Sequence, residues 1–170
     1  MGTMTDIRLL LTLGLLLGFA SLSTDIFLPA LPAMAADLGA AQAELELVVS
    51  VYLLGFCAGQ LAWGPISDIF GRRWPIMLGI VAFSAGSAGC AMAEGAGTVI
   101  AWRLVQALGA SAGVVLARAM VRDIYDGDRA AGVLSTLMTI MAIAPLMGPL
   151  IGAQILVLWS WRAIFWSLVA

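Results

Sequence analysis

The stretch LVVSVYLLGFCAGQLAWGPISDIFGRRWPIMLGIVAFSAGSAGCAM, residues 47–92, decides the fold class. It contains two apolar runs, residues 47–66 and 75–92, and each is close to the roughly 20 residues that a helix needs to cross a bilayer. The polar link between them, residues 67–74, is short, so the two helices must be antiparallel neighbours. This stretch therefore predicts a pair of membrane-spanning helices.

The same pattern continues on both sides of this pair. In the N-terminal apolar run, residues 9–34, the polar stretch 21–25 interrupts the pattern, and Pro29 and Pro32 bend or end the helix. We predict an all-α membrane protein with five complete transmembrane helices and the start of a sixth, inside which the chain is expected to be cut off. The predicted spans are residues 9–34, 47–66, 75–92, 98–116, 134–158 and 163–170.

The composition agrees with lipid as the solvent and excludes several kinds of protein. Hydrophobic residues make up 62% of the chain and charged residues only 11%, which is far from a soluble domain. The absence of histidine excludes Ser-His-Asp and Cys-His catalysis and histidine-ligated zinc. Cys57 and Cys90 lie in separate apolar runs without metal-ligand spacing. We expect no enzyme, no metal and no cofactor, and the net charge of −2 does not indicate a nucleic-acid partner.

The arginines predict the orientation in the bilayer, because loops on the cytoplasmic side are rich in positive charge. As the spans alternate in direction, most arginines fall on one side, whereas Arg162 falls on the other and Arg103 lies within a span. The opposite loops carry acidic residues. We therefore expect a multi-pass protein with a cytoplasmic N-terminus. The arginines on the cytoplasmic side are Arg8, Arg72, Arg73, Arg118, Arg122 and Arg129.

Two charged residues, Asp25 and Arg103, remain inside the apolar spans. Asp25 lies about 25 Å along a helix from Arg8, and Arg103 lies about 22 Å from Arg118 on the same side, at about 1.5 Å per residue. The two charges therefore lie at similar depth. They are interpreted as a fixed structural ion pair, as an Arg103 that extends separately to the outer interface, or as a proton or substrate site lining a cavity. Gln106 lies on the same helix face as Arg103 and is placed to line that cavity.

A stripe of small residues marks the fifth span. Ala144, Gly148 and Gly152 recur at four-residue spacing, and small residues at this spacing allow another helix to approach closely. Pro145 and Pro149 remove backbone donors from the same helix. This combination favours a functional bend over ordinary membrane packing.

At this point the chain resembles the major facilitator superfamily, and within it the drug:proton antiporters of the bicyclomycin and chloramphenicol resistance type. The stretch from Ser23 to Pro32 is similar to the first-span motif of that subfamily. Three further motifs carry the resemblance. They are the loop signature (Gly64, Asp68, Gly71, Arg72 and Arg73), the fourth-span motif (Arg103, Gln106 and Gly109), and the fifth-span antiporter motif (Gly148, Pro149 and Gly152).

The resemblance implies an architecture. Family members have twelve spans in two six-span bundles, each made of two inverted repeats, and spans one and four line the central cavity. Residues 1–170 are then the N-terminal bundle, truncated in its sixth helix, and the missing C-terminal half is a required partner. The resemblance also implies that Asp68 contacts the other half, that Arg103 takes part in proton coupling, and that Gly148 and Pro149 form the bend.

The function implied is proton-coupled export of small amphiphilic drugs across the bacterial inner membrane, with the lipid bilayer, the drug and protons as partners. One alternative is a transporter of a metabolite or sugar within the same superfamily. A second alternative, from another class, is a non-transporting membrane receptor or assembly partner. The fragment itself is expected to be inactive, because transport requires one bundle to rock against another.

Overall fold

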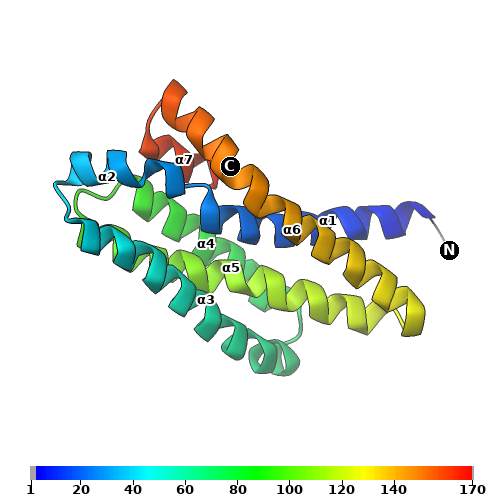
Figure 1. Ribbon diagram of the computed structural model, residues 1–170. Coiled ribbons are helices and arrows are strands. Elements are labelled where there is room, and N and C mark those ends of the chain that lie inside the picture. Colours follow the sequence, from blue (N-terminus) through cyan, green and yellow to red (C-terminus); the bar gives the residue numbers. More distant parts are fainter. Residues whose placement is uncertain (1–2, 170) are drawn as a thin grey trace.

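The computed structural model describes residues 3–169, and in this part of the chain every regular element is helical. This agrees with the all-α fold class predicted from the apolar runs. Figure 1 shows the helices as a bundle of long rods with short connections. Their bounds are α1 Thr3–Asp25, the 3-10 turn η1 Leu28–Ala30, α2 Leu31–Leu38, α3 Gln42–Phe70, α4 Arg73–Ala91, α5 Ala96–Ile124, α6 Gly127–Leu158 and α7 Trp161–Ser167.

Five segments of the described chain are long and apolar enough to cross a membrane, the first being α1 and α2 taken together as Arg8–Leu38. These five segments are longer than the spans predicted for them. The link between α5 and α6 shrinks to Tyr125 and Asp126, because α5 continues through Arg122 and Asp123. The length of an apolar run reflects only the thickness of the hydrocarbon layer. A helix can continue beyond that layer into the interface, because arginine is a good helix former.

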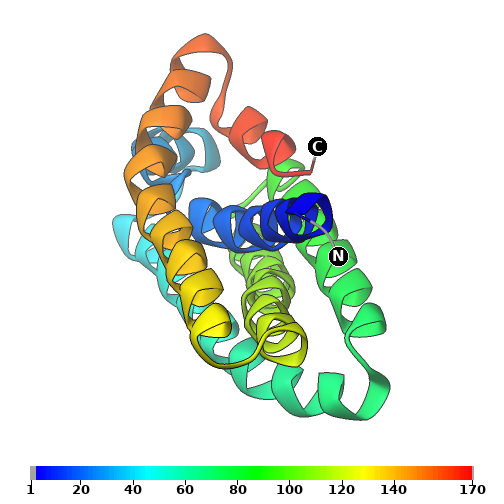
Figure 2. The ribbon, with the colours of Figure 1, turned by 90° about the vertical axis from the view of Figure 1, so that its right-hand side faces the viewer.

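Helix α5 is the packing centre of the bundle. It contacts α3 and α4 along much of its length and also contacts α1. Its apolar segment is 61% buried, compared with 17% for α6. Figure 2 shows α1 in the middle of the view, with α6 on one side and α4 on the other. The fourth span therefore holds its buried residues against helices from both ends of the sequence.

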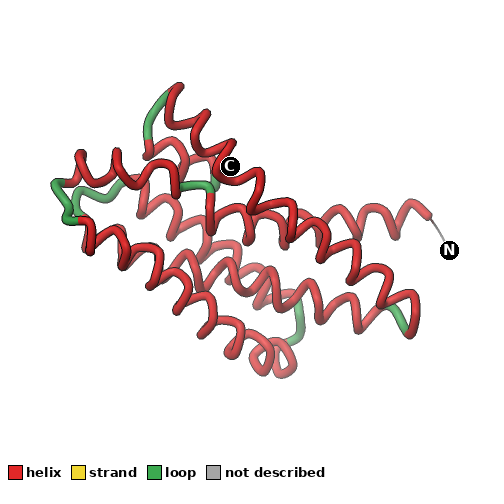
Figure 3. The backbone as a smooth tube through the Cα atoms, viewed as in Figure 1, coloured by secondary structure: helices red, strands yellow, loops and turns green. Residues whose placement is uncertain are grey.

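The first span is broken just after Asp25. The chain leaves α1, forms η1, and resumes as α2 at Leu31, so that a short loop interrupts the helix in Figure 3. Pro29 and Pro32 lack the backbone N–H that would continue the helical hydrogen bonds at this point. The last helical bond before the break runs from the Ile26 N–H to the Leu22 carbonyl, at 3.0 Å. Backbone carbonyls at the end of α1 are therefore free for other donors.

Ion pairs tie the helices together at both ends of the bundle. At one end Arg72, between α3 and α4, pairs with Asp68 of α3 and Asp123 of α5. At the other end Arg162, at the start of α7, pairs with Asp37 of α2. The connections that the alternation of spans assigns to one side of the bilayer thus lie at one end of the bundle.

Candidate functional site

Arg103 is completely buried in the middle of the bundle, on the face of α5 that meets α1. Its Nη1 donates a hydrogen bond of 2.7 Å to the Gln106 side-chain oxygen and a longer one of 3.3 Å to the Ser23 carbonyl. The Ser23 carbonyl belongs to the last turn of α1, where the negative end of the helix dipole lies. The guanidinium therefore caps the end of α1 at the break.

Gln106 is held in turn by α4. Its Nε2 donates to the Ser87 hydroxyl at 2.6 Å, and that hydroxyl donates to the Phe83 carbonyl at 2.8 Å. The backbones of α4 and α5 come close here, because a Cβ at Gly86 would lie 2.5 Å from the Gln106 backbone nitrogen. The Gln106 amide, predicted to line a cavity, is completely buried here and accepts a hydrogen bond from Arg103. Ser87 is not identifiable from the sequence, because its only signal is a polar residue in an apolar span.

Aromatic rings surround the Arg103 guanidinium. Its central carbon lies 4.0 Å from the centre of the Phe27 ring and 3.9 Å from that of Tyr52, with the Phe165 ring farther away at 5.9 Å. The Tyr52 and Ser23 hydroxyls share a hydrogen bond of 2.7 Å. These rings are not identifiable from the sequence either, because aromatic residues are common in spanning helices and their spacing does not reveal which ones meet a charge.

Asp25 lies on the other face of the same turn. Its Cβ faces α6, since a Cβ at Gly148 would lie 3.5 Å from it, whereas Ser23, two residues earlier, offers its backbone carbonyl to Arg103. Among the residues that the structure describes, Arg103 forms no ion pair with Asp25 or with any other carboxylate, and its Nε and Nη2 have no hydrogen-bond partner. The structure thus brings Arg103 and Asp25 to the same break without direct contact between them.

The small residues of α6 pack against this break from the Asp25 side. A Cβ at Gly148 would lie 3.5 Å from the Asp25 Cβ and 3.3 Å from the Ile26 nitrogen. A Cβ at Gly152 would collide with the Ile26 carbonyl oxygen. Gly152 is therefore required for α6 to reach the broken turn of α1, whereas a Cβ at Gly148 would make tight but near-ordinary contacts.

Helix α6 continues through both of its internal prolines, Pro145 and Pro149. Pro145 has no N–H to donate to the Met141 carbonyl four residues earlier. The Ser21 hydroxyl of α1 donates to that carbonyl instead, at 3.1 Å. The proline thus creates an acceptor through which α1 and α6 are joined one turn below Asp25.

The loop signature forms a separate charged cluster at one end of the bundle. Arg72 donates through Nε to Asp123 at 2.9 Å and through Nη1 to Asp68 at 2.7 Å, and it also bonds the Ser67 hydroxyl. The Asp123 carboxylate, more than Asp68, raises the pKa of Arg72 above its ordinary value. Asp123 and Ser67 are the members that the signature does not include.

The other members of the signature differ in their roles. Gly71 has a φ of 76°, which favours glycine, and it turns the chain between α3 and α4. A Cβ at Gly64 would meet nothing within 4 Å. In the described residues Arg73 forms no ion pair, in contrast to Arg72.

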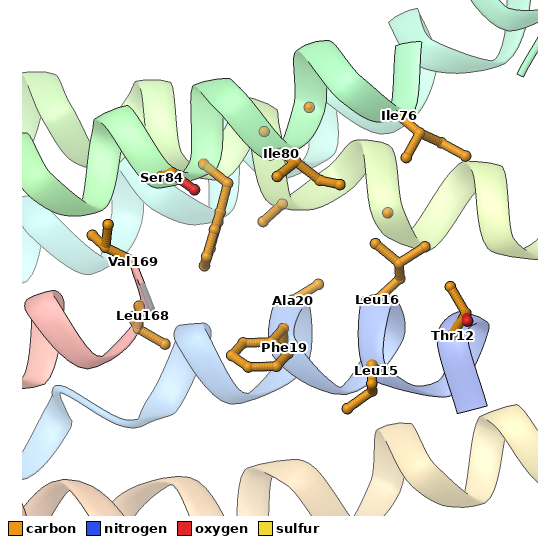
Figure 4. A pocket seen from close by; sticks show the side chains of 15 residues that line it. Thr12, Leu15, Leu16, Phe19, Ala20, Ile76, Ile80, Ser84, Leu168 and Val169 are labelled. Atoms are coloured by element: carbon orange, nitrogen blue, oxygen red, sulfur yellow. The ribbon is translucent and has the colours of Figure 1, made fainter. Parts of the chain in front are cut away.

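A long apolar groove of about 320 Å³ runs between α1 and α4, with α5 at its base. Figure 4 shows Leu16 and Phe19 of α1 facing Ile80 of α4 across this groove, with Leu168 at one end. A second apolar groove of about 570 Å³ lies between α1 and α6. Neither groove includes Asp25 or Arg103 among its lining residues.

The comparisons with known proteins agree with one another. The family model described as Major Facilitator Superfamily matches residues 13–170. The uncharacterized MFS-type transporter YdgK of Bacillus subtilis (strain 168) is 40% identical, over 90% of this chain and 39% of that protein. A chloramphenicol resistance protein of Pseudomonas aeruginosa is 40% identical, over 86% of this chain and 35% of its own length. The multidrug resistance protein MdtL of Escherichia coli O45:K1 is 38% identical, over 85% of this chain and 37% of its own length. The chain thus spans less than two fifths of these relatives.

Proposed function

The chain belongs to the major facilitator superfamily, and we propose that its parent protein exports small amphiphilic drugs across the bacterial inner membrane in exchange for protons. Two of the relatives are named for resistance to chloramphenicol or to multiple drugs, which supports drugs as the substrate class. The observation that carries the coupling is the broken turn of α1, where the partly buried acid Asp25 lies beside the completely buried cation Arg103.

In this proposal Asp25 is the group that gains and loses the proton. Ionised acids within spans are rare and mark ion or substrate pathways. A proton that moves inward down 100 mV releases about 2.3 kcal/mol, which corresponds to a substrate gradient of about 50-fold. Arg103 supplies a positive charge near the carboxyl, and the glycines of α6 allow the turn that carries Asp25 to fit beside them.

We propose further that residues 1–170 are the N-terminal bundle of the parent and that the cytoplasmic end is the one with Arg72. Helix α7 begins at Trp161, and the groove between α1 and α4 continues from Leu168 along α1 towards Thr12. This groove is the expected seat for the remainder of a sixth span. The relatives, of which this chain covers 35–39%, have the length for it and for a second bundle.

The test is drug susceptibility of a bacterial strain that lacks its major efflux pumps and expresses the full-length parent. We expect protection against chloramphenicol or lipophilic cations that disappears with a protonophore. Asp25→Asn should abolish the protection, because the amide cannot exchange a proton, while the amount of protein in the membrane stays the same. Glu94→Gln, which changes an exposed acid in the link between α4 and α5, is the matched control and should keep full protection.

Two results would contradict the proposal. Undiminished protection by Asp25→Asn would remove Asp25 from the coupling. No protection by the wild-type parent against any compound, with the protein present in the membrane, would favour a metabolite transporter of the same superfamily.

A further inference from the structure

Within the part of the chain that the structure describes, Arg103 is a buried cation without a carboxylate partner. Burying a charge is unfavourable unless other groups replace the water that is lost. The Ser23 carbonyl and the Gln106 amide oxygen accept hydrogen bonds from Nη1 alone, and Nε and Nη2 have no partner among the described residues. Most of the guanidinium therefore depends on something other than hydrogen bonds.

The two closest rings supply that stabilisation. Phe27 and Tyr52, here called the ring pair, lie 4.0 Å and 3.9 Å from the guanidinium carbon, well inside the range at which a ring face attracts a cation. Both side chains are almost completely buried. They come from different segments, Phe27 from the break after α1 and Tyr52 from α3. The position of the charge is thus set by the packing of three helices.

The Tyr52 hydroxyl ties the ring pair to the break. The Ser23 hydroxyl lies 2.9 Å from the Ala20 carbonyl, to which it donates, so the hydrogen in the Tyr52–Ser23 bond comes from Tyr52. Ser23 therefore accepts one hydrogen bond from Tyr52 through its side-chain hydroxyl and another from Arg103 through its backbone carbonyl. Removal of the hydroxyl alone leaves the ring in place, whereas removal of the ring takes away one of the two groups that hold the charge.

We propose that Phe27 and Tyr52 are positioning residues that hold Arg103 as a fixed positive charge at the break, so that Asp25 alone exchanges the proton. This inference rests on the proposed function. The ionisable side chains that interact electrostatically with Arg103 are Asp25 from α1, Tyr52 from α3 and Cys90 from α4. The Cys90 thiol faces the Val99 carbonyl at 3.8 Å, and α7 presents the uncharged Phe165 ring.

The experiment measures the protonation of Asp25 without any transported substrate. Dicyclohexylcarbodiimide reacts with protonated carboxyl groups in apolar surroundings. We would label the full-length parent in detergent micelles over a range of pH and quantify the Asp25 peptide by mass spectrometry, with Asp25→Asn as the blank. Arg103→Gln removes the positive charge near Asp25. The shift of the pH midpoint of labelling in this variant defines the direction expected when that charge is lost.

We expect Tyr52→Leu and Phe27→Leu to move the midpoint in the same direction as Arg103→Gln. A charge displaced by a few ångströms at an effective dielectric constant of about 20 changes a carboxyl titration by about half a pH unit. Tyr52→Phe should keep the wild-type midpoint, because the ring remains. Phe56→Leu removes a ring one turn along α3, which stacks on Tyr52 at 6.2 Å, and it is the matched control that should leave the midpoint unchanged.

The outcomes separate this inference from the proposed function. Midpoints of Tyr52→Leu and Phe27→Leu that coincide with the wild type, in variants that elute as folded protein, would overturn the role of the ring pair and leave the proposed function standing. An Asp25 that is not labelled at any pH would overturn both. Equal shifts in Tyr52→Phe and Tyr52→Leu would assign the effect to the hydroxyl and also overturn the role of the ring.

Discussion

Gln106 is a residue whose side chain has both of its polar atoms satisfied inside the bundle. Its oxygen accepts from Arg103 and its nitrogen donates to Ser87. In apolar surroundings, removal of one member of a hydrogen-bonded group leaves its former partners buried without hydrogen bonds. This is more unfavourable than replacement of all the members by apolar side chains. This places Gln106 between the buried charge and α4.

We therefore predict that Gln106→Leu lowers the free energy of unfolding by about 1–3 kcal/mol, because Arg103 loses its shortest hydrogen bond. The measurement is the thermal unfolding midpoint of the full-length parent in detergent. Gln60→Leu is the control, since Gln60 is a partly buried amide in α3 for which the described residues show no hydrogen bond. An equal loss in both variants would refute the specific role of Gln106.

The residue scale also shows where prediction from sequence succeeds and where it stops. Counting helical rise from Arg8 and Arg118 places Asp25 and Arg103 at one depth, and in the structure Arg103 bonds to the turn of α1 that ends at Asp25. Depth follows from distance along a helix, which a sequence contains. The rotation of each helix about its own axis is not contained in the sequence. A direct ion pair between Asp25 and Arg103 could therefore not be distinguished from two charges at the same depth without contact.

At the scale of elements, α6 and the break in α1 form one fitted contact. Gly148 and Gly152 face the broken turn, and Ser21 of α1 donates to the carbonyl that Pro145 leaves free. The four-residue spacing of the small residues predicted a close helix approach. The partner was not predictable, because a small-residue stripe specifies a surface and not the helix that lies on it.

Substitution of Gly152 tests this contact. We predict that Gly152→Ala displaces the turn after Asp25 and lowers stability by about 1–3 kcal/mol, because the new methyl group collides with the Ile26 carbonyl. It should also lower drug export by the full-length parent. Gly132→Ala is the matched control in the same helix, where a Cβ meets nothing within 4 Å. There the higher helix propensity of alanine should keep or slightly raise stability.

Thermal unfolding midpoints of the two variants, measured side by side in one detergent, give the comparison. A Gly152→Ala protein as stable and as active as Gly132→Ala would mean that α6 can withdraw from α1 without consequence.

For the whole molecule, the two charged clusters mark the two ends of the bundle. Arg162 is the arginine that departs from the positive side in the sequence, and the structure pairs it with Asp37 and the Ala93 carbonyl. Arg162 alone does not reverse the arginine bias, because Arg8, Arg72, Arg73, Arg118, Arg122 and Arg129 lie on the other side in the sequence. Its contacts with α2 and with the link before α5 give it a structural role that the sequence did not reveal.

The proposed orientation leads to a labelling prediction. In a full-length parent in which Cys57 and Cys90 are replaced, Glu94→Cys should react with a membrane-impermeant maleimide on spheroplasts with an intact inner membrane. Asp126→Cys should react only after the inner membrane is opened. Both positions are exposed in links between helices, so access to the reagent is comparable. The reverse pattern would place the N-terminus outside.

The break in α1 also has a consequence for how this protein is made. The serine whose carbonyl Arg103 caps is synthesised 80 residues before that arginine. At about 5–20 residues per second, the ribosome needs roughly 4–16 seconds to cover that distance. During this interval the polar turn has neither its cation nor the glycines of α6, and the ring of Tyr52 follows only 29 residues after Ser23. The polar turn of the first span therefore stays unpacked, beside the insertion machinery or in contact with water, until the fourth and fifth spans are inserted and enclose it.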